Sequence, residues 1–167
     1  MSPQTIDLDL DYLPHLPSRI DYGIGCLGAG FIMRDVHLVA YKNAGFKVVA
    51  ISDISAESAR KAAELRGIPR VHHSLEALLA DPQVQILDIA IPPDKQLEVI
   101  AEAVRRPHIL GILAQKPLAM NLKEARQIVE LCAKAGKNSK RTRIGIRYSS
   151  MAGVYRQRMR EASRCTR

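Results

Sequence analysis

An apolar run from Gly23 meets two closely spaced glycines, Gly28 and Gly30, and passes straight into a helical pattern. Bare backbone between a strand and a helix lets a phosphate approach main-chain N–H groups. The N-terminus of the helix adds a partial positive charge at the same place. The segment is therefore typical of a turn that binds the phosphates of a dinucleotide. Met33 stands where the usual pattern has a third glycine, which predicts a looser or shifted contact between helix and strand.

An acid ends the second expected strand, which covers residues 47–53. Asp53 follows Gly30 by 23 residues, close to the roughly 20 that separate a glycine loop from a ribose-binding acid. A carboxylate there accepts hydrogen bonds from both ribose hydroxyls and repels a 2′-phosphate. Because residues 54–56 include no arginine to receive that phosphate, we expect NAD rather than NADP as the cofactor. The alternative is that the glycines form a tight turn and Asp53 is a solvated loop acid.

Strand and helix patterns alternate along the chain. Strands are expected at 22–27, 47–53, 70–72, 84–91 and 108–114, and helices at 31–44, 56–66, 75–80, 95–105 and 122–135. Ser55, Ser74 and Asp94 are the expected N-caps, and Asn121 with Glu124 forms a capping-box pattern. Near-continuous apolar strands indicate a parallel sheet that is buried on both faces. We therefore expect an α/β protein with a doubly wound parallel sheet, the Rossmann fold.

The charge is divided unevenly along the chain. Residues 1–136 hold 15 Lys and Arg against 16 Asp and Glu, a net charge of −1, whereas residues 137–167 hold 10 against 1, a net charge of +9. Gly136 is expected to end the last helix of the domain. We therefore divide the chain into an N-terminal extension (1–21), a nucleotide-binding domain (22–136) and an irregular basic tail (137–167). Such a basic run is typical of a solvated or disordered segment.

The sequence does not support a membrane protein, a secreted protein or a metal-binding protein. No apolar run approaches the roughly 20 residues that span a membrane. The first 21 residues carry four aspartates and lack the basic start and apolar stretch of a signal peptide. Cys26, Cys132 and Cys165 show no C-x-x-C spacing, and no His/Cys/Asp/Glu cluster has metal-ligand spacing. We therefore expect a cytoplasmic protein with no metal site.

Four motifs, in order along the chain, resemble those of the Gfo/Idh/MocA oxidoreductases: Gly28-Ala29-Gly30, Asp53, Ile91-Pro92-Pro93 and Gln115-Lys116-Pro117. The resemblance extends from about residue 20 to residue 136. It implies a Rossmann domain followed by an α/β domain whose large open sheet supplies much of the substrate site. It also implies NAD(P)-dependent hydride transfer between a nicotinamide and a carbinol carbon of a sugar or cyclitol, so the expected partner is a small molecule.

The resemblance also implies roles for single residues. Lys116 is expected to bind and polarise the reacting hydroxyl and to assist its proton transfer, because ligands bind beyond the carboxyl ends of parallel strands. Gln115 replaces the glutamate of the family's Glu-Lys-Pro motif, and the 116–117 peptide bond is a candidate cis bond. Gln96 is the candidate to replace a histidine that contacts the cofactor. The expected cofactor-binding set is Gly28, Gly30, Phe31, Ile32, Asp53, Ile91, Pro92, Pro93, Gln96, Gln115, Lys116 and Pro117.

The second half of the implied site has no counterpart in this sequence. The family's further acid and histidine would follow the Lys-Pro motif, but no D-x-x-x-H occurs after residue 117. A further strand is expected at 142–148. The abrupt change of charge leads to the hypothesis that the reading frame is truncated or shifted near residue 137. We therefore expect this chain alone to be inactive, and we expect any homo-oligomer to belong to a full-length form.

Two other functions stay open beside the oxidoreductase. The chain can be a non-catalytic dinucleotide-binding module that reports NAD or partners another chain. A contact between the basic tail and nucleic acid is less favoured, because the tail has no recognised binding motif and phosphate attraction alone is non-specific.

Overall fold

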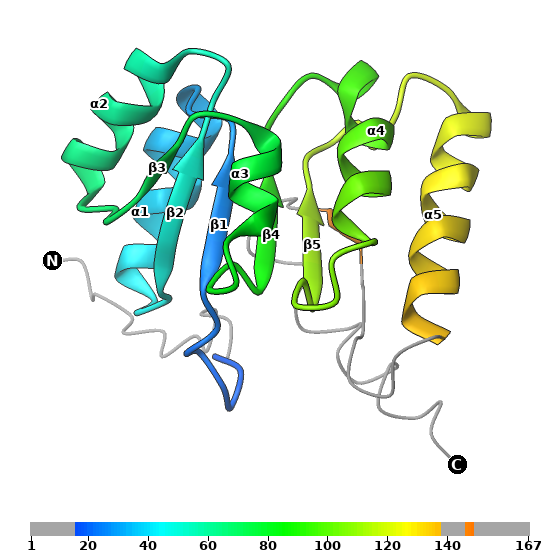
Figure 1. Cartoon of the computed structure of the whole chain (residues 1–167), viewed down its shortest axis with the longest axis horizontal. Helices are drawn as coiled ribbons and strands as arrows, with labels where there is room; N and C mark the ends of the chain where they lie inside the picture. The colour runs from blue at the N-terminus through cyan, green and yellow to red at the C-terminus, as the bar shows by residue number, and fades with distance from the viewer. Residues whose placement is uncertain (1–15, 138–145, 149–167) are drawn as a thin grey trace, which may run out of the picture. The chain divides into compact units, whose positions relative to one another are not determined.

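The computed structural model describes residues 16–137 and 146–148 and is built on a parallel sheet of six strands in the order β3-β2-β1-β4-β5-β6 (Figure 1). The strands are β1 (Ile24–Leu27), β2 (Val48–Ser52), β3 (Val71–His72), β4 (Ile86–Ile89), β5 (Gly111–Ala114) and β6 (Ile146–Tyr148). The helical elements are η1 (Ile32–His37), α1 (Leu38–Asn43), α2 (Ala56–Arg66), α3 (Leu75–Ala80), α4 (Pro93–Ala103) and α5 (Leu122–Lys137). All of them lie in one compact unit, Ser18–Ser149. The strand order confirms the expected doubly wound Rossmann fold.

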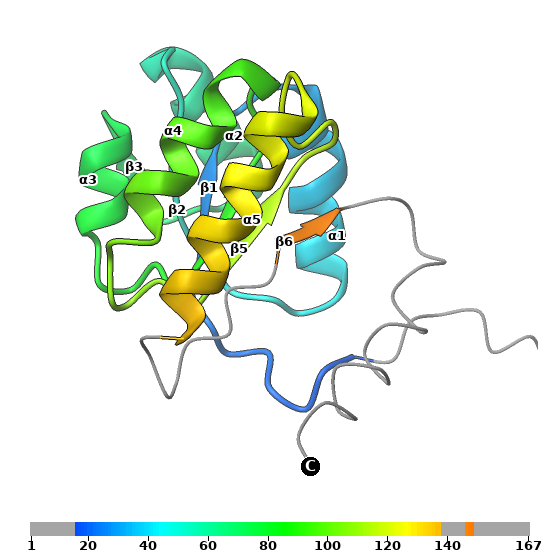
Figure 2. The ribbon, with the colours of Figure 1, turned by 90° about the vertical axis from the view of Figure 1, so that its right-hand side faces the viewer.

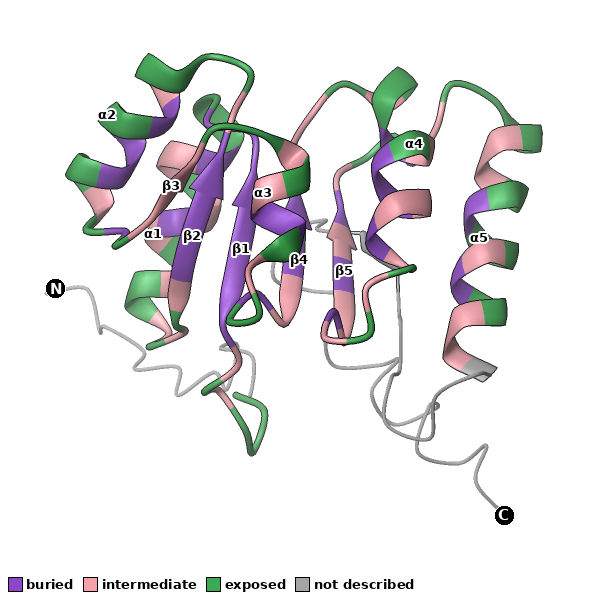
Figure 3. Ribbon diagram, viewed as in Figure 1, coloured by how far each residue is buried: buried purple, intermediate pink, exposed green. Residues whose placement is uncertain are grey.

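Helices cover both faces of the sheet (Figures 1 and 2). On one face, Met33 of η1 and Ala62 of α2 pack in a hydrophobic cluster with strand residues. On the other face, Leu78 of α3, Ile100 of α4 and Ile128 of α5 belong to a second cluster. β1, β2 and β4 are buried along almost their whole length (Figure 3), which explains why their sequences are apolar without alternation.

Local side-chain chemistry sets most helix ends. The hydroxyls of Ser55 and Ser74 accept hydrogen bonds from the N–H groups of Ser58 and Ala77, at 3.2 and 3.0 Å, so both expected N-caps are confirmed. Gly67 ends α2 in the left-handed conformation, with φ of 70°. Such a backbone favours glycine because it has no Cβ.

Asn121 and Glu124 form the expected cap at the start of α5. The side-chain Oδ1 atom of Asn121 accepts from the backbone N–H of Glu124 at 3.0 Å, and its Nδ2 atom donates to the Glu124 carboxylate at 2.8 Å. The carboxylate also accepts from the N–H of Met120 at 3.2 Å, one residue before the cap, so it satisfies a free donor in the manner of a capping box.

Two expected helix boundaries are wrong. Helix α4 begins at Pro93 with Pro92 at the N-cap position, so Asp94 lies inside the first turn and is not the cap. Proline suits the first helical position because its φ is already helical and it has no N–H to leave unpaired. Helix α5 continues through Gly136 to Lys137, so this glycine does not end the helix.

The first helix starts with a π-helical segment, η1. Met33 occupies the position of the absent third glycine, and its side chain is completely buried. The N–H of Leu38 donates to the carbonyl of Met33 five residues earlier, as in a π turn. A wider turn makes room for the Met33 side chain where a glycine would allow close packing. The expected looser or shifted contact between helix and strand stays a prediction.

β6 extends the sheet past residue 136, the expected end of the domain. It pairs in parallel with β5, and Ile146 lies opposite Ile112. This strand falls within the range expected for one, 142–148, of which residues 142–145 lie outside the described residues. Most of the expected basic tail and residues 1–15 of the expected N-terminal extension also lie outside them.

Candidate functional site

The residues expected to form a site come together at the carboxyl edge of the sheet. Hydrogen bonds join the ends of neighbouring strands there: the N–H of Gly28 donates to Ser52 at 2.8 Å, that of Ala90 to Leu27 at 2.9 Å, and that of Gln115 to Ile89 at 3.1 Å. The strand order reverses between β1 and β4, so the middle of this edge is a topological switch point. Open α/β sheets bind their ligands at such a point.

The two glycines of the loop differ in what surrounds them. Gly28 has a φ of 94°, and an added Cβ would collide with the carbonyl of Ala90, so the fold itself requires a glycine. Gly30 is exposed, its φ lies outside the left-handed region, and an added Cβ would meet no protein atom within 4 Å. The protein's own packing therefore does not explain Gly30. The open space beside it suits a ligand that approaches the backbone closely.

Asp53 closes the glycine loop from the end of β2. Its Oδ2 atom accepts a hydrogen bond from the N–H of Ala29 at 2.6 Å, and its Oδ1 atom accepts from the N–H of Ser55 at 2.8 Å. A carboxylate offers about four acceptor positions, so two remain for further donors such as ribose hydroxyls. Asp53 therefore both holds the loop and keeps acceptors available beside it.

Apolar side chains frame the same edge. Phe31 and Ile32, directly after the loop, are 66% and 41% exposed. Ile91 and Pro93 are half-buried and Pro92 is exposed, in the turn between β4 and α4. Exposed apolar groups beside an open glycine form a surface that can accept a flat ring.

The turn Gln115–Pro117, which we call the Lys116 turn, follows β5. Lys116 is exposed, and the peptide bond between Lys116 and Pro117 is cis, as expected. Gln96 lies beneath this turn and is completely buried. Its Nε2 donates to the carbonyls of Gln115 and Pro117, at 3.1 and 2.9 Å. The structure gives Gln96 a role in supporting the turn, and its expected contact with a cofactor stays a prediction that this burial does not favour.

A buried polar network that the sequence analysis missed lies behind the Lys116 turn. Asp88, in the middle of β4, is 1% exposed. Its Oδ2 atom contacts His37 Nδ1 at 2.7 Å and accepts from the Tyr41 hydroxyl at 2.6 Å. His37 Nε2 lies 2.7 Å from Gln115 Nε2. The network thus connects the first helix to the turn that carries Lys116.

Burial and charge act in opposite directions on His37. Burial by itself lowers the pKa of the imidazole, but the hydrogen bond and the charge of Asp88 outweigh it and hold the pKa above its ordinary value. One sequence signal could have revealed the network: Asp88 interrupts an apolar strand, and a buried carboxylate needs partners. His37 and Tyr41, four residues apart on one helix face, are suitable partners.

Comparison with known proteins places this architecture in a family. The family model described as an oxidoreductase family with an NAD-binding Rossmann fold, Gfo/Idh/MocA, matches residues 22–140. The chain belongs to the Gfo/Idh/MocA oxidoreductase family.

Characterised relatives are distant in sequence. D-apiose dehydrogenase of Paraburkholderia graminis is 32% identical over 111 residues, which cover 66% of this chain and 29% of that protein. Inositol 2-dehydrogenase of Gluconacetobacter diazotrophicus is 29% identical over 130 residues, which cover 77% of this chain and 38% of that protein. This chain spans about a third of the length of these relatives.

A solved structure shows the same fold. The crystal structure of myo-inositol dehydrogenase from Lactobacillus casei in complex with NAD(H) and myo-inositol matches with a TM-score of 0.64 at 24% identity. The match covers 75% of this chain and 36% of that one. The shared part is therefore the Rossmann domain.

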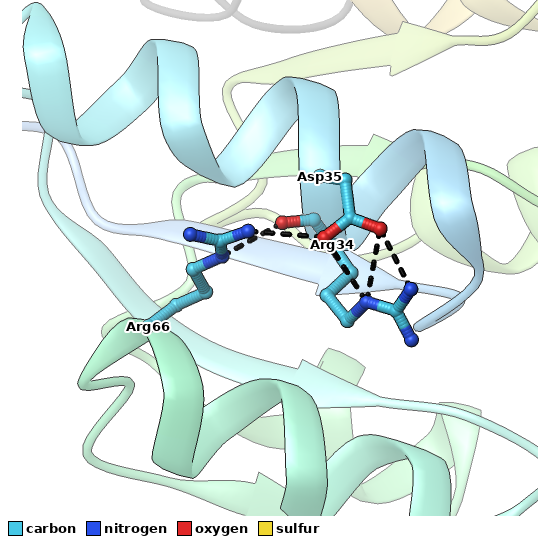
Figure 4. A network of polar contacts seen from close by, with 3 residues as sticks. All are labelled: Arg34, Asp35 and Arg66. Carbon is cyan, nitrogen blue, oxygen red and sulfur yellow. Dashed lines mark hydrogen bonds and ion pairs between the residues drawn. The ribbon is translucent and has the colours of Figure 1, made fainter.

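In this Gfo/Idh/MocA domain an ion-pair network fixes the helix that follows the glycine loop (Figure 4). Asp35 binds Arg34 at 2.6 Å and Arg66, at the end of α2, at 3.0 Å. Arg66 also donates to the carbonyl of Arg34 at 2.8 Å. The hydrogen bond from Arg34, with the help of Arg66 and against the effect of burial, holds the pKa of Asp35 below its ordinary value. Both guanidinium groups are thus bound to Asp35, and Arg66 joins α2 to η1.

Metal and membrane binding receive no support from the part of the chain that the structure describes. No three His, Cys, Asp or Glu side chains within it gather in a way that could hold a metal ion. None of its helices has both the length and the apolar character needed to cross a bilayer.

Proposed function

We propose that this chain forms the NAD(P)-binding part of an oxidoreductase that moves hydride between a nicotinamide and a carbinol carbon of a sugar or cyclitol. The observation that carries the proposal is the open space at Gly30, a glycine without a packing or conformational reason of its own, at the switch point of the sheet. The names of the relatives, D-apiose dehydrogenase and inositol 2-dehydrogenase, support the substrate class.

The residues at this edge fit a dinucleotide. The backbone at Gly28 and Gly30 and the start of the first helix would face the phosphates. The free acceptor positions of Asp53 would take the ribose hydroxyls, and Phe31, Ile32 and the turn from Ile91 to Pro93 would lie against the nucleoside parts. When bound, the nicotinamide supplies the hydride donor or acceptor.

Lys116 is the proposed catalytic residue. It is exposed at the end of β5, where a substrate hydroxyl beside the cofactor would come within reach. Its ammonium group would donate a hydrogen bond to the reacting oxygen and stabilise the negative charge that develops there as hydride leaves the carbon. Gln96 and Gln115 support the backbone of the same turn.

We also propose NAD rather than NADP as the preferred cofactor. The carboxylate of Asp53 would repel a 2′-phosphate. Arg34 and Arg66 are bound to Asp35, so neither is free to receive that phosphate without losing an ion pair.

Fluorescence titration of NADH with the full chain tests the proposal. We expect saturable enhancement of NADH fluorescence, and we expect Gly30→Leu to abolish it without lowering the urea midpoint. Glu64→Leu, an exposed position on α2, is the control for an added leucine and should bind as the wild type does. No saturable binding by the wild type at high protein concentration would refute the proposal.

A non-catalytic dinucleotide-binding module is the second candidate. It is favoured because the part of the chain that matches the family, residues 22–140, is described by its NAD-binding Rossmann fold. We expect the pure chain to bind NADH but to show no appreciable turnover with inositol or glucose. Steady reduction of NAD by the 167-residue chain would contradict this expectation.

A further inference from the structure

The two ends of the Gln115 side-chain amide contact different groups. Its Oε1 atom accepts a hydrogen bond from the N–H of Lys116 at 3.2 Å. Its Nε2 atom lies 2.7 Å from Nε2 of His37. One end of the amide therefore supports the backbone of the Lys116 turn, and the other end contacts the buried imidazole.

This arrangement determines which proton the imidazole carries. An amide NH2 group only donates, so the Nε2 atom of His37 must accept. The imidazole is then neutral, with its proton on Nδ1, where it can donate to the carboxylate of Asp88 at 2.7 Å. The Tyr41 hydroxyl donates to the same carboxylate oxygen, so Asp88 is a charged acceptor with two donors.

A second proton on His37 conflicts with this arrangement. The protonated Nε2 becomes a donor and faces the NH2 group of Gln115, which is also a donor. Gln115 would satisfy it by turning its side-chain carbonyl towards His37. The NH2 group would then face the N–H of Lys116, and that N–H would lose its acceptor.

We propose that Gln115 couples the protonation of His37 to the backbone of the Lys116 turn, which makes His37 a pH-sensitive positioning residue for Lys116. Protonation of the imidazole breaks the hydrogen bond from the Lys116 N–H, and deprotonation restores it. An effect of this coupling on hydride transfer rests on the proposed catalytic function of Lys116. A glutamate at position 115, as in the family's motif, would accept from both neighbours at once and remove the conflict.

Several titratable groups surround the imidazole. Asp88 on β4 raises the pKa of His37, and the same carboxylate, after burial, contributes to the raised pKa of Cys26 on β1. Tyr41 lies on the same helix, and Lys116 follows Gln115. Arg34 and Asp35 on η1 pair with each other and with Arg66 of α2. The charge of Asp88 favours the imidazolium, whereas the NH2 group of Gln115 favours the neutral ring.

NMR of the full chain tests the coupling without any cofactor. Long-range 1H–15N correlations of 15N-labelled histidine report the tautomer and the pKa of His37, assigned by comparison with His37→Gln. We expect a neutral ring protonated on Nδ1 at high pH. The backbone amide of Lys116 should shift with the same midpoint as His37.

Gln115→Glu gives the second measurement. We expect the pKa of His37 to rise by about 1–3 units, because a carboxylate replaces a neutral donor. The Lys116 amide should then stop following His37 across the wild-type midpoint. Gln127→Glu, the same change at an exposed position on α5, should leave both titrations unchanged.

Three results would each overturn the inference: a neutral His37 protonated on Nε2, a Lys116 amide that does not follow His37 in the wild type, or an unchanged His37 pKa in a folded Gln115→Glu variant. If that variant does not fold, the wild-type titration alone decides. NADH is absent from these experiments, so their failure would leave the proposed function standing. Failure of the wild type to bind NADH would refute that function alone.

Discussion

Gly28 and Gly30 stand two residues apart and serve different purposes. Gly28→Ala forces a side chain into a left-handed backbone and against the carbonyl of Ala90, so we expect a loss of about 1–3 kcal/mol in the free energy of unfolding. Gly30→Ala meets no protein atom, so its stability should match the wild type. Its affinity for NADH should fall, because the Cβ projects into the proposed phosphate position. Urea unfolding and NADH titration of both variants separate the two effects, and equal stability losses would show that the distinction is wrong.

Asp53 has a structural and a proposed binding role that two variants can separate. Asp53→Asn keeps one oxygen acceptor for the backbone of the glycine loop but removes the negative charge. We expect a weaker affinity for NADH and a smaller preference for NADH over NADPH, since the repulsion of the 2′-phosphate is gone. Asp53→Ala removes both acceptors, and we expect it to lose more than about tenfold in NADH affinity, equal to about 1.4 kcal/mol.

Dissociation constants for NADH and NADPH, measured on both Asp53 variants, check this prediction. Glu64→Gln on the exposed face of α2 is the matched neutralising control and should not change either constant. An unchanged ratio of the two constants in Asp53→Asn would remove Asp53 from the discrimination between the cofactors.

At the residue scale, the sequence predicts motifs that are continuous along the chain, and it misses contacts between residues that are distant in sequence. The glycine loop and the Lys116 turn are continuous motifs, so they could be recognised directly. His37 and Asp88 are 51 positions apart, and only the packing of the first helix against β4 makes them neighbours. The expected cofactor contact of Gln96 rests on its position after Pro92 and Pro93. In the structure its buried amide instead donates to two carbonyls of the Lys116 turn.

Elements whose ends depend on their own side chains were predicted well. The caps at Ser55 and Ser74 and the left-handed Gly67 are local signals, and α2 and α3 have the expected bounds. The expected start of α4 is wrong because proline is itself a favourable first helical residue, so the helix begins at Pro93 and not after Asp94. Gly136 was interpreted as a helix end, whereas α5 continues one residue beyond it.

The π-helical start of the first helix leads to a prediction about Met33, which replaces the third glycine of the usual glycine-loop motif. Restoring the third glycine by Met33→Gly would bring the loop closer to the usual pattern, but it would remove a completely buried side chain. Truncating a buried methionine costs about 2–5 kcal/mol, and glycine within a helix adds about 1 kcal/mol relative to alanine. We therefore expect Met33→Gly to be strongly destabilised, as measured by urea unfolding.

Met33→Leu is the matched control, because it keeps a buried apolar side chain of similar volume and should cost less than about 1.5 kcal/mol. A Met33→Gly variant as stable as the wild type would contradict the packing role of the buried Met33 side chain.

At the scale of the whole molecule, two buried ionisable groups are expected to shape stability on opposite sides of neutrality. The pKa of His37 lies above 6.5 because Asp88 outweighs burial. Asp81 is buried, which alone would raise its pKa, but the N–H of Gln83 and the side chains of His72 and Arg70 hold it below 3.8. Folding therefore favours the proton on His37 and its absence on Asp81.

The signs follow from linkage. The contribution of His37 is complete below its unfolded-state pKa of 6.5 and is lost as the pH rises through the higher folded-state pKa. The contribution of Asp81 is complete above 3.8 and is lost as the pH falls through the lower folded-state pKa. Both contributions are therefore complete between these two unfolded-state values, and the effect of these two groups is a maximum of stability at weakly acidic pH.

Urea midpoints measured from about pH 3 to pH 9 on three proteins test this profile, because that range extends to both sides of the ordinary pKa values of the two groups. The wild type should lose stability above pH 6.5, and His37→Gln should lose that slope while keeping the acid-side slope. Asp81→Asn should show the reverse. A shift of one pKa unit corresponds to about 1.4 kcal/mol in the free energy of unfolding. Both substitutions are also expected to lower the stability at every pH. The three proteins are therefore compared by how their stability changes with pH and not by its absolute value. An alkaline slope that survives in His37→Gln would assign it to another group and would contradict the raised pKa of His37.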